Sequence, residues 1–188
     1  MRFCSNCAAP ISKRVPPGDS LPRFVCDQCG EIHYQNPRLV VGTLPERDGQ
    51  LLLCRRAIEP RYGYWTLPAG YMENGESTAQ AAIRETLEEA GAKIELGEAF
   101  TMISIPHVNQ VHLFYRAKLL ELDFKPGDET LDVKMVDEAQ VPWKELAFRT
   151  VSMTLKQWYE DRKAGSYGFH ASEIGTGGVP PPPVAPRS

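Results

Sequence analysis

The chain has 188 residues, of which 42% are hydrophobic and 24% are charged, and its formal net charge is -3. This size suits one globular domain with a small appendage. The acidic balance excludes a broad basic surface, so we do not expect general binding to nucleic acid. No apolar run reaches the roughly 20 residues of a membrane span, and the N-terminal segment lacks the apolar core of a secretory signal. We therefore expect a soluble, cytoplasmic protein.

The first 34 residues hold two CxxC pairs separated by 18 residues, namely Cys4, Cys7, Cys26 and Cys29. Two such pairs at this spacing predict a zinc ribbon, in which four thiolates close a tetrahedral structural site. Zinc would supply folding energy that so small a segment cannot draw from its own core. The alternatives are a redox-active pair or a ribbon that no longer binds metal. The fifth cysteine, Cys54, lies in the apolar run LLLC and is expected in the core.

Residues 36–164 carry the hydrophobic periodicity of a folded domain. Segments rich in β-branched and aromatic residues predict strands. Helical patterns are found at two places, and strands before, between and after helices favour an α+β fold with a mixed sheet and helices on its faces. The predicted strands are 38–44, 50–57, 98–105, 110–119 and 132–136, and the predicted helices are 78–90 and 149–163.

Residues 165–188 are rich in glycine and then in proline. Such a composition buries too little apolar surface to offset the entropy of ordering, so we expect a flexible tail. The alternative is a polyproline ligand for a partner protein.

The helix predicted over 78–90 has well-marked ends, since Ser77 and Gln80 have the spacing of a capping box and Gly91 follows its last residue. A 3,1,3,1,3 spacing predicts one face made of Ala79, Ala82, Ile83, Thr86, Leu87 and Ala90. The opposite face should then carry three carboxylates, those of Glu85, Glu88 and Glu89.

These three glutamates are unfavourable for helix stability. Glu85 and Glu89 form a like-charge i,i+4 pair that costs roughly 0.2 to 0.5 kcal/mol. Glu88 and Glu89 lie in the last turn, where the helix dipole disfavours negative charge by roughly 0.3 to 1 kcal/mol each. No Lys or Arg within the predicted helix follows four residues later. A solvated acidic face is the alternative interpretation, but Mg²⁺ or Mn²⁺ would reverse this balance, so we predict a divalent metal site.

Residues 70–92, GYMENGESTAQAAIRETLEEAGA, match the pattern G-x5-E-x7-R-E-U-x-E-E-x-G-U at every fixed position, with Thr86 and Ala92 as soft matches. The chain therefore resembles the Nudix hydrolases, which implies an α/β/α sandwich and catalytic divalent ions. By this resemblance the metal ligands are Glu85, Glu88, Glu89 and the Gly70 carbonyl, with Glu76 and Arg84 as a bracing pair. The run into the motif, WTLPAG, departs from the common PGG at Ala69.

A zinc ribbon before a Nudix domain resembles the NADH pyrophosphatases, although their motif SQPWPFPxS is missing here. The chain is more similar to plant chloroplast-type FAD pyrophosphatases, through HYQNP, ISIPHVNQV, PGDE and VPWKELAF. These resemblances imply a homodimer that cleaves FAD, ADP-ribose or NADH to AMP and a second monophosphate. A nucleotide sensor or nucleic-acid-binding regulator without turnover, and a hydrolase of nucleotide-capped RNA, are the alternatives.

Outside the box, the resemblance indicates Glu129 as a further metal ligand or base; a turn glutamate after Pro126 and Gly127 is the alternative. Candidate substrate contacts are Pro106, His107, Gln110, Tyr71 and Tyr64. A tyrosine ring can stack on adenine or flavin, and the polar side chains can form hydrogen bonds with a nucleotide.

Overall fold

In the computed structural model, which describes residues 1–175, the chain divides into two units between Pro37 and Arg38. The first unit holds an antiparallel sheet in the order β1-β2-β3. Its strands are β1 (Ile11–Arg14), β2 (Arg23–Cys26) and β3 (Ile32–His33).

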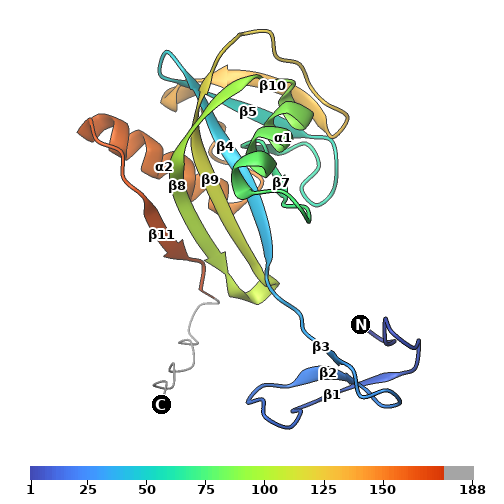
Figure 1. Cartoon of the computed structure of the whole chain (residues 1–188). Coiled ribbons are helices and arrows are strands. Elements are labelled where there is room, and N and C mark those ends of the chain that lie inside the picture. Colours follow the sequence, from blue (N-terminus) through green and yellow to red (C-terminus); the bar gives the residue numbers. More distant parts are fainter. Residues whose placement is uncertain (176–188) are drawn as a thin grey trace. The chain divides into compact units, whose positions relative to one another are not determined.

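The second unit is built on one mixed sheet with the strand order β10-β5-β4-β9-β8-β11 (Figure 1). β4 and β9 are parallel, as are β8 and β11, whereas the other neighbours on this path are antiparallel. The short strand β6 pairs with β5, and β7 pairs with β4. The bounds are β4 (Arg38–Arg47), β5 (Gln50–Arg56), β6 (Trp65–Thr66), β7 (Ala69–Tyr71), β8 (Ile94–Ile105), β9 (Gln110–Leu119), β10 (Thr130–Val136) and β11 (His170–Glu173), with 3₁₀ turns η1 (Pro106–Val108) and η2 (Glu138–Gln140).

Two helices, α1 (Thr78–Ala90) and α2 (Arg149–Ala164), cover opposite faces of this sheet. Val41 of β4 packs against alanines of α1, whereas Leu44, three residues later, packs in the cluster that contains Leu155 of α2. Because successive side chains of a strand alternate between faces, these contacts place the helices on either side. The predicted α+β sandwich with a mixed sheet is confirmed.

Both ends of α1 are formed by side chains and turns that the sequence indicated. The Ser77 hydroxyl accepts a hydrogen bond from the Gln80 backbone, and the Gln80 side chain accepts one from the Ser77 backbone. Gly91 adopts a left-handed conformation, and its N–H donates to the Leu87 carbonyl. The predicted bounds of the helix are therefore correct.

The predicted division of α1 into an apolar and an acidic face is wrong. Ile83 and Leu87 are exposed, whereas Glu85 and Glu89 are only 9% exposed. The helix approaches the sheet through small residues, and the Thr86 hydroxyl lies 2.6 Å from that of Thr43 on β4. β7 and the segment after β9 pack beside this line of contact, so they cover the two glutamates instead of leaving them in water.

The prediction of a flexible tail from residue 165 is wrong for residues 170–173. Residues 170–173 form β11, which pairs in parallel with β8. The Asp161 carboxylate holds this segment against α2, because it accepts hydrogen bonds from the Gly168 backbone and lies 2.7 Å from His170 Nε2. Composition did not reveal these long-range contacts. Residues 176–188, which contain the polyproline run, lie outside the described residues.

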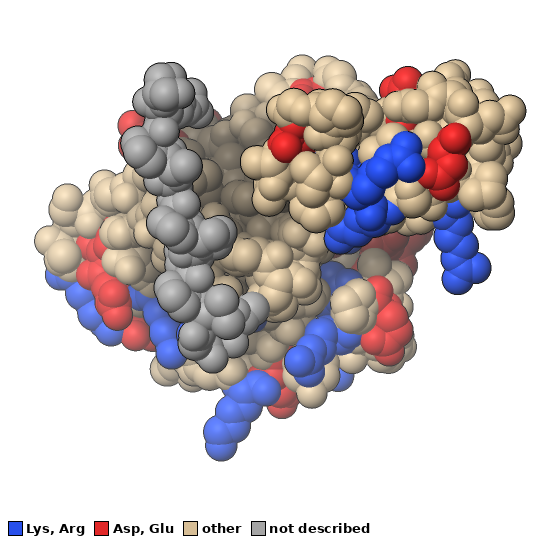
Figure 2. Space-filling view, turned by 90° about the horizontal axis from the view of Figure 1, so that it is seen from below, with Lys and Arg blue, Asp and Glu red and all other residues tan. Residues whose placement is uncertain are grey.

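The surface in Figure 2 carries Lys and Arg side chains interspersed with Asp and Glu side chains. Among the described residues, no helix combines the length and the apolar character that a membrane crossing requires.

Candidate active site

Arg84 connects the charged residues of the motif. Its guanidinium binds both oxygens of Glu76, at 2.7 and 3.1 Å, so the predicted bracing pair is present as a contact. The Nη1 atom also donates to Glu85 at 2.7 Å and to Glu88 at 3.0 Å. The Nη2 atom donates to the backbone carbonyl of Tyr71 at 3.1 Å. These contacts raise the pKa of Arg84, so the side chain stays charged. The hydrogen bonds with Glu76 contribute most to this shift.

The strain expected in α1 is therefore smaller than the sequence suggested for two of the three glutamates. Arg84 precedes Glu88 by four residues, a spacing at which opposite charges attract on a helix. The predicted strain took account only of basic residues after the glutamates, whereas Arg84 lies before them. Glu89 receives no contact from Arg84; the N–H of Ala69 donates to its carboxylate at 2.9 Å.

Burial gives Glu85 and Glu89 unusual acidities. Burial, reinforced by the charges of Glu85 and Glu129, raises the pKa of Glu89 to about 8, although the Ala69 N–H opposes the shift. Burial also raises the pKa of Glu85, against the opposing effect of Arg84. A buried carboxylate is costly unless a cation or hydrogen bonds compensate it. Hard oxygen ligands in such a setting fit Mg²⁺ or Mn²⁺.

Two glycines allow the chain to pass close to these carboxylates. The Glu85 carboxylate occupies the space that a side chain at Gly70 would need. A side chain at Gly127 would collide with the backbone carbonyl of Glu88. A larger residue at Gly70 would push the Glu85 carboxylate aside, and one at Gly127 would displace the backbone of α1 or of the segment packed on it.

The segment that contains Gly127 also completes the C-terminal end of α1. The N–H of Lys125 donates to the Ala90 carbonyl at 2.9 Å, and that of Gly127 to the Glu89 carbonyl at 3.0 Å. Two carbonyls without helical partners are thereby satisfied. The same segment brings Glu129 near enough to Glu89 for its charge to raise the pKa of that residue. The predicted site residue Glu129 thus lies within electrostatic range of Glu89.

Arg56 is a neighbour of the site that the sequence did not indicate. Its positive charge lowers the pKa of Glu89, its guanidinium lies 5.2 Å from the Phe148 ring centroid, and its Nε donates to the Pro60 carbonyl. A single arginine at the end of a strand carries no motif, so only the fold reveals this proximity.

The candidate substrate contacts divide into two groups. Gln110 donates from Nε2 to the Tyr71 hydroxyl at 2.8 Å, and Pro106 and His107 form the 3₁₀ turn just before Gln110. Tyr64 lies instead in the segment between β5 and β6, where the Arg61 guanidinium is 5.5 Å from its ring centroid. Within residues 1–175, no hydrogen bond joins Tyr64 to the first group.

The four cysteines of the first unit meet at one point. Their four sulfur atoms all lie within 4.8 Å of one another. Both CxxC turns close in the same way, since the N–H four residues after Cys4 and after Cys26 returns to the carbonyl of that cysteine. The residues at this fourth position, Ala8 and Gly30, have positive φ angles. The pKa of Cys26 is lowered to about 6, chiefly because its sulfur accepts a hydrogen bond from the N–H of Cys29. A thiolate cluster of this kind fits tetrahedral zinc.

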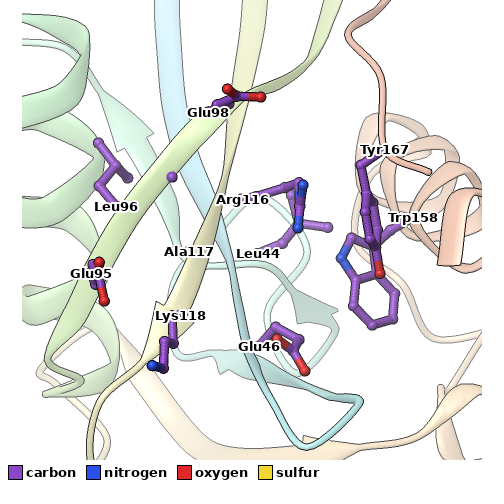
Figure 3. Close-up of a pocket in the computed structure, with 11 residues that line it drawn as sticks. Leu44, Glu46, Glu95, Leu96, Glu98, Arg116, Ala117, Lys118, Trp158 and Tyr167 are labelled. Atoms are coloured by element: carbon purple, nitrogen blue, oxygen red, sulfur yellow. The ribbon is translucent and has the colours of Figure 1, made fainter. Parts of the chain in front are cut away.

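A cavity of about 380 Å³ lies elsewhere in the second unit, on the face of the sheet that α2 covers (Figure 3). Its wall includes Trp158 of α2 and Tyr167, and the Arg116 guanidinium lies 3.7 Å from the Tyr167 ring centroid. It contains none of the predicted site residues.

Comparison with known families gives a match over nearly the whole described chain. Residues 2–35 match the N-terminal zinc ribbon of Nudix proteins, and residues 36–159 match the NUDIX domain. The chain belongs to the Nudix family. The motif in residues 70–92 is therefore the Nudix box, and the predicted family and fold are confirmed.

Individual Nudix proteins extend this comparison. A crystal structure of a NUDIX hydrolase from Nitrosomonas europaea is 49% identical, with a TM-score of 0.90 over 93% of this chain and 99% of that one. The NAD-capped RNA hydrolase NudC of Chromobacterium violaceum is 31% identical over 134 residues, which are 70% of this chain but 48% of that protein. An ADP-ribose pyrophosphatase of Methanocaldococcus jannaschii is 29% identical over 119 residues, 61% of this chain and 69% of that protein. The chain spans about half the length of the NudC proteins it matches.

Proposed function

We propose that this Nudix protein is a divalent-cation-dependent pyrophosphohydrolase that cleaves the diphosphate of FAD, ADP-ribose or NADH. Water adds to one phosphorus, the bridging P–O bond breaks, and the products are AMP and a second monophosphate. The observation that carries this proposal is the set of three carboxylates on α1, two of them buried, which Arg84 and the backbone hold together. The names of the relatives, NAD-capped RNA hydrolase and ADP-ribose pyrophosphatase, support the same substrate class.

The ligands for Mg²⁺ or Mn²⁺ would be Glu85, Glu88, Glu89 and the Gly70 carbonyl. A bound divalent ion at this place neutralises phosphate charge and lowers the pKa of an attacking water. Arg84 keeps the carboxylates of Glu85 and Glu88 oriented through its hydrogen bonds. Such fixed geometry matters because a displacement of about 1 Å at a catalytic group can cost roughly 100-fold in rate.

Glu129 has a place in this proposal as a further ligand or as the base that accepts the proton of water. Its charge already acts on Glu89 in the folded chain. Glu129→Gln keeps the shape of the side chain and removes the charge, so kcat should fall at least 10-fold while the fold persists. An unchanged kcat would leave Glu129 as a turn residue only.

A substrate panel tests the proposal. The pure protein is incubated with Mg²⁺ and with FAD, ADP-ribose or NADH, and the release of AMP is measured. Glu88→Gln and Glu89→Gln should abolish turnover and leave the circular dichroism spectrum unchanged. The matched control is Glu160→Gln on the exposed side of α2. No AMP from any substrate would refute the proposed activity, and turnover in both variants would refute the metal assignment.

Hydrolysis of a nucleotide-capped RNA is the second candidate, and the name of the NudC relatives favours it. The chemistry and the carboxylates would be the same, but binding would involve several phosphates. Preference for NAD-capped RNA over free NAD, with a steep loss of affinity at high salt, would support this candidate. Equal rates on both at all salt concentrations would support the small dinucleotide.

Within the same proposal, zinc fills the cysteine cluster, and the protein is a cytoplasmic homodimer. One zinc per chain, measured by atomic emission, and a dimer mass in sedimentation equilibrium are the expected results. A monomer mass at all concentrations would refute the homodimer without affecting the activity.

A further inference from the structure

A continuous series of hydrogen bonds runs from the interior of α2 to Tyr71. It begins at Thr150, which is 1% exposed, in the first turn of that helix. The Thr150 hydroxyl lies 3.0 Å from Nδ1 of His112, and Nε2 of His112 lies 3.1 Å from Oε1 of Gln110. Nε2 of Gln110 then donates to the Tyr71 hydroxyl at 2.8 Å. The series thus links a buried side chain at the start of α2 to a residue of the Nudix box.

The direction of these hydrogen bonds follows from the chemistry of each group. The Gln110 Oε1 atom can only accept, so Nε2 of His112 must carry the hydrogen. Burial lowers the pKa of His112 to about 4, so near neutral pH its ring holds a single hydrogen. Nδ1 of His112 therefore accepts from the Thr150 hydroxyl. At the other end, the Tyr71 oxygen accepts from the Gln110 amide, which leaves the hydrogen of Tyr71 unused in this series.

Tyr71 is held on three sides at the edge of the carboxylate site. Its carbonyl accepts from Arg84, which also binds Glu85, and its hydroxyl accepts from Gln110. The Arg38 guanidinium lies 4.8 Å from its ring centroid. Its side chain is nevertheless exposed. Gly70 faces the Glu85 carboxylate, so the side chain of the next residue, Tyr71, points to the other face of β7. A ligand bound at the carboxylates has to extend past this strand to contact the hydroxyl.

We propose that Thr150, His112 and Gln110 are positioning residues that present the Tyr71 hydroxyl as a hydrogen-bond donor to an oxygen of the adenosine diphosphate group. This inference rests on the proposed function for its ligand. It also changes the role expected of Gln110, which acts on substrate through Tyr71. His112 and Thr150 are new to the site, because neither belongs to a sequence motif.

The direction of the series can be measured without any ligand. In ¹⁵N NMR spectra, the two neutral tautomers of histidine give different nitrogen shifts. Assigned through His112→Asn, the ring should carry its proton on Nε2. A proton on Nδ1 would overturn the proposal, because the series would then run the other way and the Tyr71 hydrogen would point to Gln110.

The role in binding is tested with AMP in the presence of Mg²⁺, by isothermal titration. Tyr71→Phe removes the donor and should raise the dissociation constant about 10-fold, as for the loss of one hydrogen bond to a charged acceptor. Gln110→Glu should give a similar loss, because a carboxylate captures the Tyr71 hydrogen. Unchanged AMP affinity in both variants would overturn the proposal.

A matched pair of variants separates positioning from general stability. Thr150→Val should shift the His112 ring signals and weaken AMP about 3-fold. Thr154→Val lies one turn later in α2, is equally buried and breaks a hydrogen bond to Thr101, but should change neither quantity. Equal effects of the two variants on AMP would overturn the positioning role.

The proposed function can fail separately from this inference. If the wild-type protein binds AMP but releases none from the substrate panel, hydrolysis fails while the positioning role stands. If the wild type does not bind AMP, the role of Tyr71 toward adenosine diphosphate fails, whatever tautomer His112 adopts.

Discussion

The cysteine cluster of the first unit and the glutamates of α1 both gather groups that repel one another when charged. They differ in what holds them. The four cysteines lie on turns of a unit whose buried cluster contains only Cys4, Ala9 and Cys26. The glutamates lie on a helix that packs on an eight-stranded sheet. Arg84 supplies a positive charge to two of them, and the Ala69 N–H binds the third.

This difference indicates two relations between metal and fold. If zinc binds the ribbon as proposed, the metal takes the place of a core, so ligand geometry and folding are one event. In the Nudix domain the protein itself already assembles the proposed ligands, so the proposed divalent ion would be needed for chemistry rather than for shape. The ribbon should therefore unfold without its metal, and the Nudix domain should not.

The largest expected effect is the loss of the ribbon on removal of zinc. Cys26→Ser deletes one of four thiolates and should unfold residues 1–37, since zinc binding supplies roughly 10 to 16 kcal/mol in comparable small units. Backbone NMR signals of this unit should collapse to random-coil positions, whereas those of the Nudix domain stay in place. Cys54→Ser, a cysteine outside the cluster, is the control for the ribbon. A ribbon that stays folded with an altered zinc site would contradict this view.

The next effect concerns Arg84. Arg84→Ala leaves Glu85 buried without its cation, so kcat/KM should fall at least 100-fold. Half-maximal activity should also require more Mg²⁺, because the ion must then gather the carboxylates itself. Arg47→Ala, which removes an exposed ion pair with Asp48, is the control. A loss of rate with an unchanged Mg²⁺ requirement would mean that Arg84 does not organise the metal ligands.

Local signals predicted most of the fold. The bounds of α1 follow from Ser77, Gln80 and Gly91, since caps depend on residues within one turn. The runs of β-branched and aromatic residues that became β4, β5, β8, β9 and β10 were also recognisable. β11 was missed because its pairing depends on contacts of Asp161 and β8 rather than on its own residues.

The site was predictable only where it is a motif. Residues of the Nudix box were found by their spacing, but the burial of Glu85 and Glu89 was not, because it depends on what packs beside the helix. Arg56 and His112 reach the site region from β5 and β9, and no periodicity marks them. Proximity across a sheet is a property of strand register, which a single sequence does not state.

The third effect is a pH dependence of the Nudix domain. The folded pKa of His112, about 4, lies below its ordinary value of 6.5, and burial is the cause. Its contribution to stability is present above pH 6.5 and is lost as the pH falls toward 4, because the unfolded chain binds one more proton. The slope should approach about 1.4 kcal/mol per pH unit within this window. Urea unfolding at several pH values measures it, and His112→Asn should flatten the curve; an equal slope in that variant would assign it to other groups.

The smallest expected effect tests whether α1 is stabilised by the protein itself or by a bound metal ion. Ser77→Ala removes the side chain that accepts the Gln80 N–H, and should lower the free energy of unfolding by about 1 kcal/mol. Because the cap belongs to the chain, the loss should be the same with and without Mg²⁺, as measured by urea unfolding in both buffers. Gln80→Ala, which removes the side chain that accepts the Ser77 N–H, should also lower the free energy of unfolding equally with and without Mg²⁺. If Mg²⁺ instead cancelled the loss, the ion would be forming the helix, and α1 would resemble the ribbon after all.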